Sequence, residues 1–205
     1  MADLPRCRRA TWPDAERWAD ALAAQILARG PPPETLVALT RGGWVPARLL
    51  ADRLGVHRLL PLRVRHWGVT ATPSARAELV GGLGEPVSGQ VVLVVDDLTD
   101  TGESLRLARE HVAALGPARL ATATFLHMAH ATFTPDFFAE EIPREEWVWV
   151  VFPWNYWEDL RELAGRARAE GADPETVRRT LAARCGLDLP LADLLRALGA
   201  PTAPG

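Results

Sequence analysis

The stretch from Gln90 to Leu105 reads Gln-Val-Val-Leu-Val-Val-Asp-Asp-Leu-Thr-Asp-Thr-Gly-Glu-Ser-Leu. Its first part, residues 91–95, is a run of branched apolar residues without alternation, which is typical of a strand buried on both faces of a parallel sheet. Three carboxylates follow closely, at Asp96, Asp97 and Asp100. From Leu105 onward apolar residues recur at helical spacing. The stretch therefore predicts a strand, a loop and a helix.

The loop between this strand and this helix is suited to bind an anion. In open α/β sheets ligands lie outside the carboxyl ends of strands, and a helix N-terminus offers unpaired N–H groups and a positive dipole end. We therefore expect a phosphate at residues 100–104. An alternative is that Asp100 only caps the helix, with Glu103 completing a capping box. Capping gives no reason, however, for the two like charges of Asp96 and Asp97.

The same residues resemble the signature of the type I phosphoribosyltransferases, which bind phosphoribosyl pyrophosphate (PRPP). That signature is an apolar strand, two acids, two further residues and then Asp-Thr-Gly-x-Ser/Thr. The resemblance implies that Asp96 and Asp97 approach the ribose hydroxyls and their Mg²⁺, with Asp97 as the metal-binding residue. It implies that Asp100 is catalytic and faces the ring nitrogens of the base. It also implies that the 5′-phosphate region is bound by Thr99, Asp100, Thr101, Gly102, Glu103 and Ser104.

A second strand, loop and helix lies earlier in the chain. Thr35 to Leu39 is a short apolar strand, and a helix is predicted from Trp44 to Leu54. Between them, paired glycines let backbone N–H groups approach an anion, and an arginine can add a charge-assisted hydrogen bond. An ordinary turn would explain this pattern by itself. Residues 40–46 are nevertheless similar to the pyrophosphate loop of bacterial xanthine-guanine phosphoribosyltransferases, which implies that Arg41, Gly42 and Gly43 bind PRPP.

The next predicted strand, Ala118 to Leu126, ends at two histidines, His127 and His130. The nearby sequence has no acid or cysteine to complete a zinc site with them. The family usually has a lysine near this position to hold the exocyclic oxygen of a purine. His127 stands in its place and could donate to the same oxygen, but this departure leaves the identity of the base open.

The segment from Glu146 to Tyr156 is rich in aromatic residues. A covered sheet edge would explain most of them. The resemblance implies that one tryptophan stacks on the base, since base recognition needs a flat apolar surface and backbone groups for the base edge. We expect Trp149 in this role, with Val150 supplying backbone contacts, and Trp147 is the alternative.

The composition of the whole chain limits its function. A net charge of -3 and a pI near 6.0 argue against general nucleic-acid binding. The N-terminal residues lack the apolar core of a signal peptide, and no apolar run reaches the length of about 18 residues needed to span a membrane. We therefore expect a cytoplasmic protein that does not bind membranes. Cys7 and Cys185 are too far apart in the sequence to suggest a disulfide framework or a metal site.

The fold expected from these features is α/β, a doubly wound and mainly parallel sheet of the type I phosphoribosyltransferase kind. Residues 1–157 would form this domain with a small hood, and the polar stretch from Arg65 to Glu78 would be a mobile loop closing over PRPP. Residues 158–205 would form a helical extension that packs or forms oligomers. We expect a homo-oligomer, either a dimer or a tetramer.

The expected reaction is transfer of the phosphoribosyl group from PRPP to a 6-oxopurine, with Mg²⁺ as cofactor. One alternative is a PRPP- or nucleotide-sensing regulator with the same fold. Another is a phosphoribosyltransferase for a non-purine base.

Overall fold

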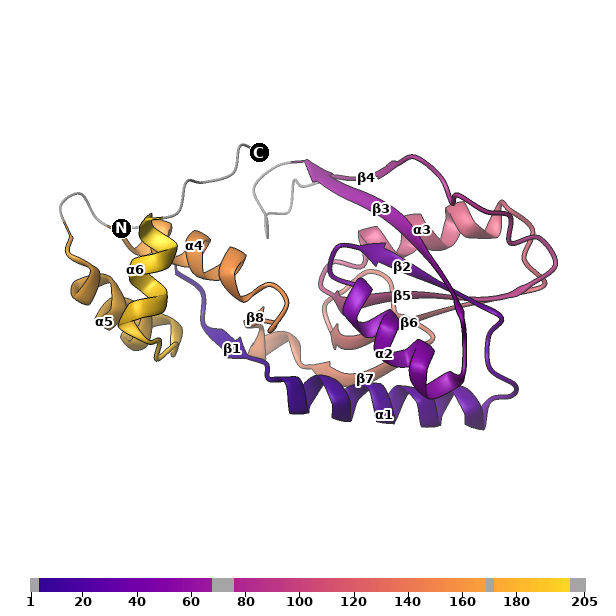
Figure 1. Ribbon diagram of the computed structural model, residues 1–205, viewed down its shortest axis with the longest axis horizontal. Coiled ribbons are helices and arrows are strands. Elements are labelled where there is room, and N and C mark those ends of the chain that lie inside the picture. Colours follow the sequence, from indigo (N-terminus) through magenta and orange to yellow (C-terminus); the bar gives the residue numbers. More distant parts are fainter. Residues whose placement is uncertain (1–3, 68–75, 169–171, 200–205) are drawn as a thin grey trace. The chain divides into compact units, whose positions relative to one another are not determined.

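The computed structural model describes residues 4–67, 76–168 and 172–199, with the backbone alone for His66, Trp67 and Arg76. The strands of its main sheet are β2 Thr35–Thr40, β3 Arg58–Trp67, β4 Arg76–Val80, β5 Val91–Thr99, β6 Arg119–Met128 and β7 Phe137–Ile142. Their order across the sheet is β4-β3-β2-β5-β6-β7 (Figure 1). Only the pair β3 and β4 is antiparallel within this sheet. The predicted α/β fold with a mainly parallel sheet is confirmed.

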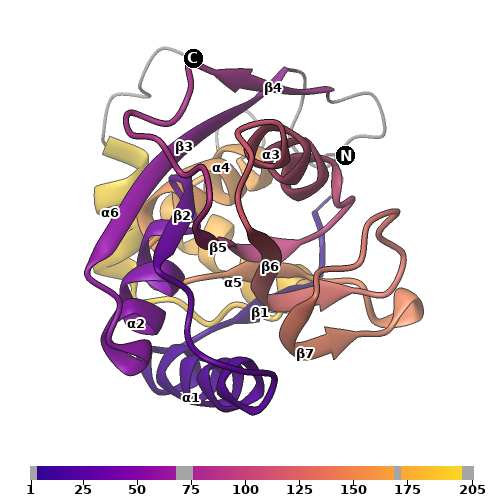
Figure 2. The ribbon, with the colours of Figure 1, turned by 90° about the vertical axis from the view of Figure 1, so that its right-hand side faces the viewer.

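Three helices cover this sheet: α1 Trp12–Ala28, α2 Trp44–Leu54 and α3 Glu103–Ala113. Helix α3 lies on one face, and α1 and α2 lie on the other (Figure 2). Leu105, Ala108 and Val112 of α3 belong to one buried cluster with apolar side chains of β2, β3 and β5. On the opposite face, the Trp18 ring of α1 lies 5.8 Å from the Phe125 ring of β6. Both faces are therefore buried, which defines the doubly wound arrangement.

Strand β5 occupies a central position between β2 and β6. Residues 92–95 are almost completely buried, because helices cover both of their faces. This explains why the apolar run in β5 does not alternate with polar residues. The end of the run, at Asp96, is also where the strand reaches the edge of the core.

Two parts of the sheet differ from the prediction. The expectation of a loop over residues 65–78 is wrong at both of its ends, since β3 extends to Trp67 and β4 begins at Arg76 as its antiparallel partner. The remaining loop residues, 68–75, lie outside the described residues. Strand β7 was not predicted either, because two glutamates interrupt its apolar pattern. One of them, Glu140, accepts a hydrogen bond of 3.1 Å from the Trp18 indole, so it lies against the helix layer.

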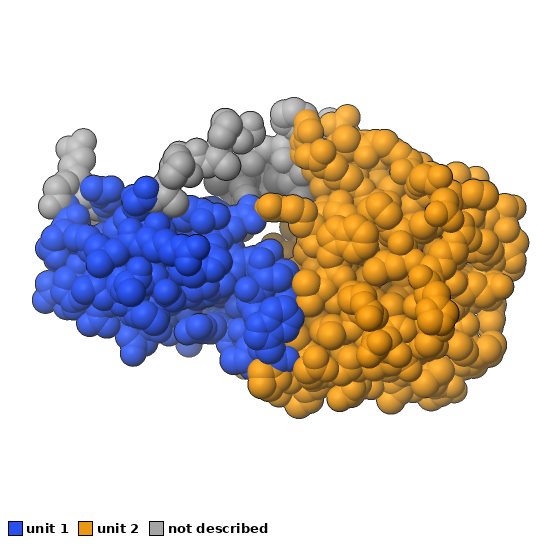
Figure 3. All heavy atoms as spheres, in the orientation of Figure 1, with its two compact units in different colours: residues 1–12, 147–205 blue, residues 13–146 orange. Residues whose placement is uncertain are grey.

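The chain divides into two compact units (Figure 3). Residues Pro13–Glu146 form the sheet unit, and Met1–Trp12 together with Trp147–Gly205 form the terminal unit. The sequence placed a boundary after residue 157, whereas residues 147–157 group here with the C-terminal helices. Which residues form the complete functional domain stays a prediction.

The terminal unit combines a two-stranded sheet with three helices. Strand β1, Cys7–Arg9, pairs in parallel with β8, Trp149–Val151. The three expected helices of the extension are α4 Tyr156–Ala167, α5 Pro174–Cys185 and α6 Leu191–Gly199, and a short 3₁₀ helix, Arg144–Glu146, precedes β8. Asp173 caps α5, accepting a hydrogen bond of 3.1 Å from the Thr176 N–H. Leucines from all three helices share one buried cluster.

The two cysteines meet in the terminal unit despite their separation in sequence. Both thiols are free. Burial, followed by the neighbouring Cys185 thiol, raises the pKa of Cys7 to about 12. Neither thiol is therefore prone to react at neutral pH, since the thiolate is the reactive form.

Within the described ranges, none of the helices combines the length and the apolar character that crossing a membrane requires.

Candidate active site

The two predicted ligand loops lie next to each other in the sheet unit. They follow β2 and β5, which pair in parallel with Val37 opposite Val94 and Ala38 opposite Val95. The carboxyl ends of these strands therefore meet at one edge of the sheet. A Cβ atom added to Gly42 would lie 2.4 Å from Oδ2 of Asp97. The glycine turn thus rests directly against the carboxylate of the acidic loop.

The second glycine of the turn has a different task. A Cβ atom on Gly43 would lie 2.4 Å from the Val95 carbonyl oxygen and 2.7 Å from that of Leu39. Its N–H donates to the Leu39 carbonyl at 2.8 Å and is therefore committed to the fold. Gly43 allows the chain to pass between two strands, while Arg41 is exposed and follows a cis peptide bond at Thr40–Arg41.

The two adjacent aspartates Asp96 and Asp97, the acidic pair, are hydrogen-bonded to each other. The Asp97 N–H donates to Oδ1 of Asp96 at 3.0 Å. Burial, and then the neighbouring charge of Asp97, raise the pKa of Asp96 well above its ordinary value. A bound cation or donated hydroxyl groups would relieve this unfavourable placement of negative charge.

The donor set of the acidic pair fits Mg²⁺. Among the described residues there is no cluster of three or more acid, histidine or cysteine side chains that could hold a metal ion. Mg²⁺ is usually held by one or two carboxylates together with substrate phosphates and water. Asp97, assisted by Asp96, offers such a partial site, which a phosphorylated substrate would complete.

The turn after β5 is shaped by Gly102. This residue has φ +86° and occupies the N-cap position of α3, so Asp100 does not. The alternative in which Asp100 caps the helix is therefore wrong. A Cβ atom on Gly102 would also lie 2.8 Å from the Phe133 N atom, so both conformation and space require glycine. Helix α3 begins at Glu103, whose N–H donates to Oγ1 of Thr101 at 3.4 Å, and the positive end of the helix dipole favours an anion at this turn.

Two neighbouring residues of this turn behave differently. Thr99 is buried, and its hydroxyl donates to Oγ1 of Thr124 at 3.2 Å, so this side chain supports the strand. Asp100 is about one third exposed, and its Oδ1 lies 3.1 Å from Nε2 of His130. The sequence analysis considered His130 only as a zinc ligand. Its position just after β6, beside the end of β5, was the signal that could have placed it near Asp100.

A family comparison agrees with this geometry. The sequence model of the family described as "Phosphoribosyl transferase domain" matches residues 10–159. The chain belongs to the phosphoribosyltransferase family. It is thus a member of an enzyme family, and its two candidate ligand loops are the loops on which the resemblance rests.

Individual phosphoribosyltransferases show the extent of the similarity. The xanthine-guanine phosphoribosyltransferase of Nitratidesulfovibrio vulgaris (strain DP4) is 32% identical over 147 residues, covering 71% of this chain and 82% of that protein. The enzyme of the same name from Gluconobacter oxydans (strain 621H) is 29% identical over 145 residues, with the same shares covered. Among solved structures, a purine phosphoribosyltransferase from Pyrococcus horikoshii Ot3 aligns with a TM-score of 0.62 and 26% identity, covering 72% of this chain and 93% of that one.

His127, the residue expected to contact the exocyclic oxygen of the base, is buried at the end of β6. It lies opposite Thr99 of β5 in the sheet register, and its ring lies 5.0 Å from the Phe138 ring. Burial lowers the pKa of His127, which favours a neutral imidazole. Within the described ranges its Nδ1 atom has no hydrogen-bond partner. A neutral imidazole can donate from one nitrogen and accept at the other, unlike a lysine.

The aromatic residues expected to bind the base in this phosphoribosyltransferase belong to the terminal unit. The Trp149 indole N–H donates to Oδ1 of Asp159 at 3.2 Å, and the Arg166 guanidinium lies 5.4 Å from its ring centroid. Val150 is buried in β8 opposite Arg8 of β1. Trp149 therefore has a structural task in this unit, whatever its part in binding the base.

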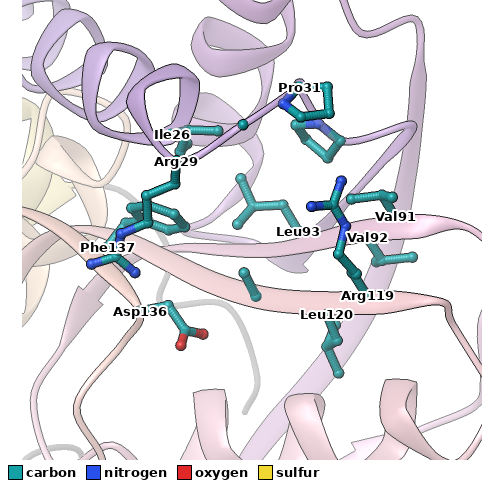
Figure 4. Close-up of a pocket in the computed structure, with 13 residues that line it drawn as sticks. Ile26, Arg29, Pro31, Val91, Val92, Leu93, Arg119, Leu120, Asp136 and Phe137 are labelled. Atoms are coloured by element: carbon teal, nitrogen blue, oxygen red, sulfur yellow. The ribbon is translucent and has the colours of Figure 1, made fainter.

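A cavity of about 330 Å³ lies elsewhere in the sheet unit (Figure 4). It is lined by the first residues of β5 and β6 and by the end of α1. Arg29 and Arg119 flank it on opposite sides, with Ile26 and Leu93 between them. Since Asp97 and Asp100 lie at the other end of β5, this cavity is separate from the candidate active site.

Proposed function

We propose that this phosphoribosyltransferase transfers the phosphoribosyl group of PRPP to a 6-oxopurine, namely guanine, xanthine or hypoxanthine, and releases pyrophosphate. The observation that carries the proposal is the contact between Gly42 and the Asp97 carboxylate at the ends of adjacent parallel strands. It joins a candidate pyrophosphate loop to a candidate ribose and metal loop in one site. The names of the relatives support a purine as the acceptor.

The glycine turn would hold the leaving group. In the reaction the bond from C1′ of the ribose to pyrophosphate breaks, and a bond from C1′ to a nitrogen of the base forms. Arg41 would bind the pyrophosphate through charge-assisted hydrogen bonds, and Gly42 would let it approach the main chain. Holding both ends of PRPP fixes C1′ between leaving group and base, which lowers the entropic part of the barrier.

The acidic pair would orient the ribose. Asp96 and Asp97 would accept hydrogen bonds from the two ribose hydroxyls, which would relieve the crowding of negative charge at this site. Mg²⁺, when bound by Asp97, would neutralise negative charge on the departing pyrophosphate.

The turn at residues 100–104 would bind the 5′-phosphate. Thr101, which is exposed, and Ser104, in the first turn of α3, offer hydroxyl groups beside the N–H groups of the helix N-terminus. Asp100 stands at the start of this turn. As the base attacks C1′, a ring nitrogen of the base loses its proton, and the Asp100 carboxylate would accept or share it.

Base recognition by His127, Trp149 and Val150 stays a prediction. The neutral imidazole expected for His127 could still donate to a purine oxygen. In the pairing of β1 with β8, the Trp149 N–H donates to Arg6 and the Val151 carbonyl accepts from Ala10. The peptide groups of alternate residues in a parallel strand face the partner strand, so those of Val150 point away from β1, which supports the proposal that they contact the base.

A homo-oligomer and a cytoplasmic location also stay predictions. Leu191 and Leu195, one turn apart on α6, are exposed and would suit a subunit contact. Light scattering coupled to size exclusion would give the oligomeric state.

The proposal is tested by measuring nucleotide formation from PRPP and Mg²⁺ with guanine, xanthine, hypoxanthine, adenine or uracil. We expect turnover with at least one 6-oxopurine and loss of turnover when a chelator removes Mg²⁺. Turnover with uracil or adenine alone would assign a different acceptor. An absence of turnover with every base, combined with a salt-dependent gel shift of RNA or DNA that is still seen at physiological salt, would favour the regulator.

A further inference from the structure

The segment that connects β6 to β7 contacts three successive residues, 100–102, of the turn after β5. Nε2 of His130 lies 3.1 Å from Oδ1 of Asp100. The Thr132 N–H and hydroxyl donate to the Thr101 carbonyl at 2.9 Å and 3.0 Å. The main chain of Phe133 packs against Gly102 so closely that no Cβ atom would fit there. Residues 100–102 are thus braced, one after another, by residues 130–133.

This connecting segment, which we call the brace, is itself held at its base. The Ala129 N–H donates to the Ile142 carbonyl at 2.9 Å, which ties the end of β6 to the end of β7. The Ala131 N–H donates to the Met128 carbonyl at 2.9 Å and closes a tight turn. His130 lies between these two anchored residues. Its imidazole is therefore presented from a fixed piece of main chain.

The three contacts of the brace act on different parts of the turn. Those of Thr132 and Phe133 hold the main chain of the turn. The contact of His130 reaches the carboxylate of Asp100 and restricts rotation of that carboxylate about its side-chain torsions. The Asp100 side chain is 33% exposed and that of His130 is 23% exposed, so a substrate can reach a carboxylate that the protein has already oriented.

We propose that His130 is a positioning residue that donates an Nε2–H hydrogen bond to Oδ1 of Asp100 and so directs its Oδ2 toward the ring nitrogen of the base. This role rests on the proposed function, because it acts through the proton acceptor of that reaction. The N–H bond of His130 stays intact throughout, and the proton of the base passes to Asp100. The benefit is preorganisation, since a misplacement of about 1 Å in a reacting group costs about 100-fold in rate.

The test uses the full chain and begins with wild-type turnover on the best purine of the panel. His130→Ala is compared with His130→Gln, which keeps an N–H donor at about the reach of Nε2 without a titratable ring. His57→Ala is the matched control, because His57 is an exposed histidine of the same unit between α2 and β3. Each variant is characterised by its single-turnover rate, its PRPP Kd by calorimetry and its Tm.

We expect His130→Ala to lower the single-turnover rate by about 10- to 100-fold with a PRPP Kd within a few-fold of wild type. The glutamine variant should recover most of the lost rate, and His57→Ala should match wild type. In an Asp100→Asn background, His130→Ala should cause little further loss, because the two residues act as a unit. Thr132→Val removes the hydrogen bond from the Thr132 hydroxyl to the Thr101 carbonyl, and it should weaken PRPP binding more than it slows the reaction.

Three results would overturn this role. The first is a wild-type rate in His130→Ala when the wild-type enzyme turns over purines. In that case only the role of His130 fails, and the proposed function stands. The second is a loss of rate that glutamine does not recover, and the third is a full additional loss in the Asp100→Asn background. If wild type forms no nucleotide with any base, the proposed function fails and this role fails with it.

Discussion

Replacing Gly42 with alanine is expected to remove most activity while the fold survives. The new Cβ atom would lie 2.4 Å from Oδ2 and 2.7 Å from Cγ of Asp97. Carbon and oxygen atoms in ordinary contact are about 3.5 Å apart, so the carboxylate would have to retreat by about 1 Å. The Asp97 side chain can do so by rotating, so the cost to stability is small. A displacement of about 1 Å at a reacting centre, however, costs about 100-fold in rate.

The assay is the single-turnover rate as a function of Mg²⁺ concentration, with Tm measured in parallel. We expect Gly42→Ala to be about 100-fold slower at saturating PRPP, to need more Mg²⁺ and to melt near the wild-type temperature. Gly43→Ala is the matched control, since its Cβ atom would meet the main-chain oxygens of Val95 and Leu39. Main chain yields less easily than a side chain, so this second variant should lose stability.

The decisive comparison uses Asp97→Ala. Without the carboxylate, the methyl group of Gly42→Ala has nothing to displace, so the double variant should be no slower than Asp97→Ala alone. A wild-type rate for Gly42→Ala would refute the reasoning. So would losses that simply add in the double variant.

Three further predictions concern the catalytic acid, the stacking tryptophan and the pH dependence of stability. Asp100→Asn keeps the size of the side chain but removes the proton acceptor, so kcat should fall by about 100-fold with PRPP Kd little changed; normal turnover would show that Asp100 is not catalytic. Trp149→Ala should raise KM for the base by an amount equivalent to about 1 to 3 kcal/mol of lost stacking, whereas Trp149→Phe should mainly lower Tm by removing the hydrogen bond to Asp159; an unchanged KM in the alanine variant would shift the stacking role to Trp147. Burial raises the pKa of both Cys7 and Tyr156 to about 12, from ordinary values of 9.0 and 10.0, and for Tyr156 the hydrogen bond to Asp193 adds to the effect. The folded state therefore keeps protons that the unfolded chain releases, so stability is full below pH 9, and Tm should fall between pH 9 and pH 12. The variant with Cys7→Ser and Tyr156→Phe should show a flatter curve, and an identical curve would contradict this explanation.

Much of the fold could be predicted because its central elements carry strong local signals. The apolar runs of β2 and β5 predict buried parallel strands, and α2 begins and ends at the predicted Trp44 and Leu54. The extension gave similar signals, with Asp173 capping α5 and Gly186 ending it in a left-handed conformation. In each case the residues that decide the structure lie within a few positions of one another.

The parts that were missed depend on partners far away in the sequence. Strand β1 is three residues long and contains two arginines, and it is a strand because β8 lies beside it. The contact between Cys7 and Cys185 has the same origin. At the candidate site, the acidic pair was identified from local sequence, whereas the contact of Asp100 with His130 depends on the pairing of β5 with β6.

The pairing of β1 with β8 has a consequence for how the protein is made. Cys7 is synthesised about 140 residues before its partner Trp149. The sheet unit, Pro13–Glu146, is complete before that partner exists and can fold first, as domains generally do during translation. Strand β1 therefore lacks its partner until β8 has been synthesised. A pause in translation before Trp149 would prolong this exposure, and the charged side chains of Arg8 and Arg9 would help to keep the waiting strand from pairing with other chains.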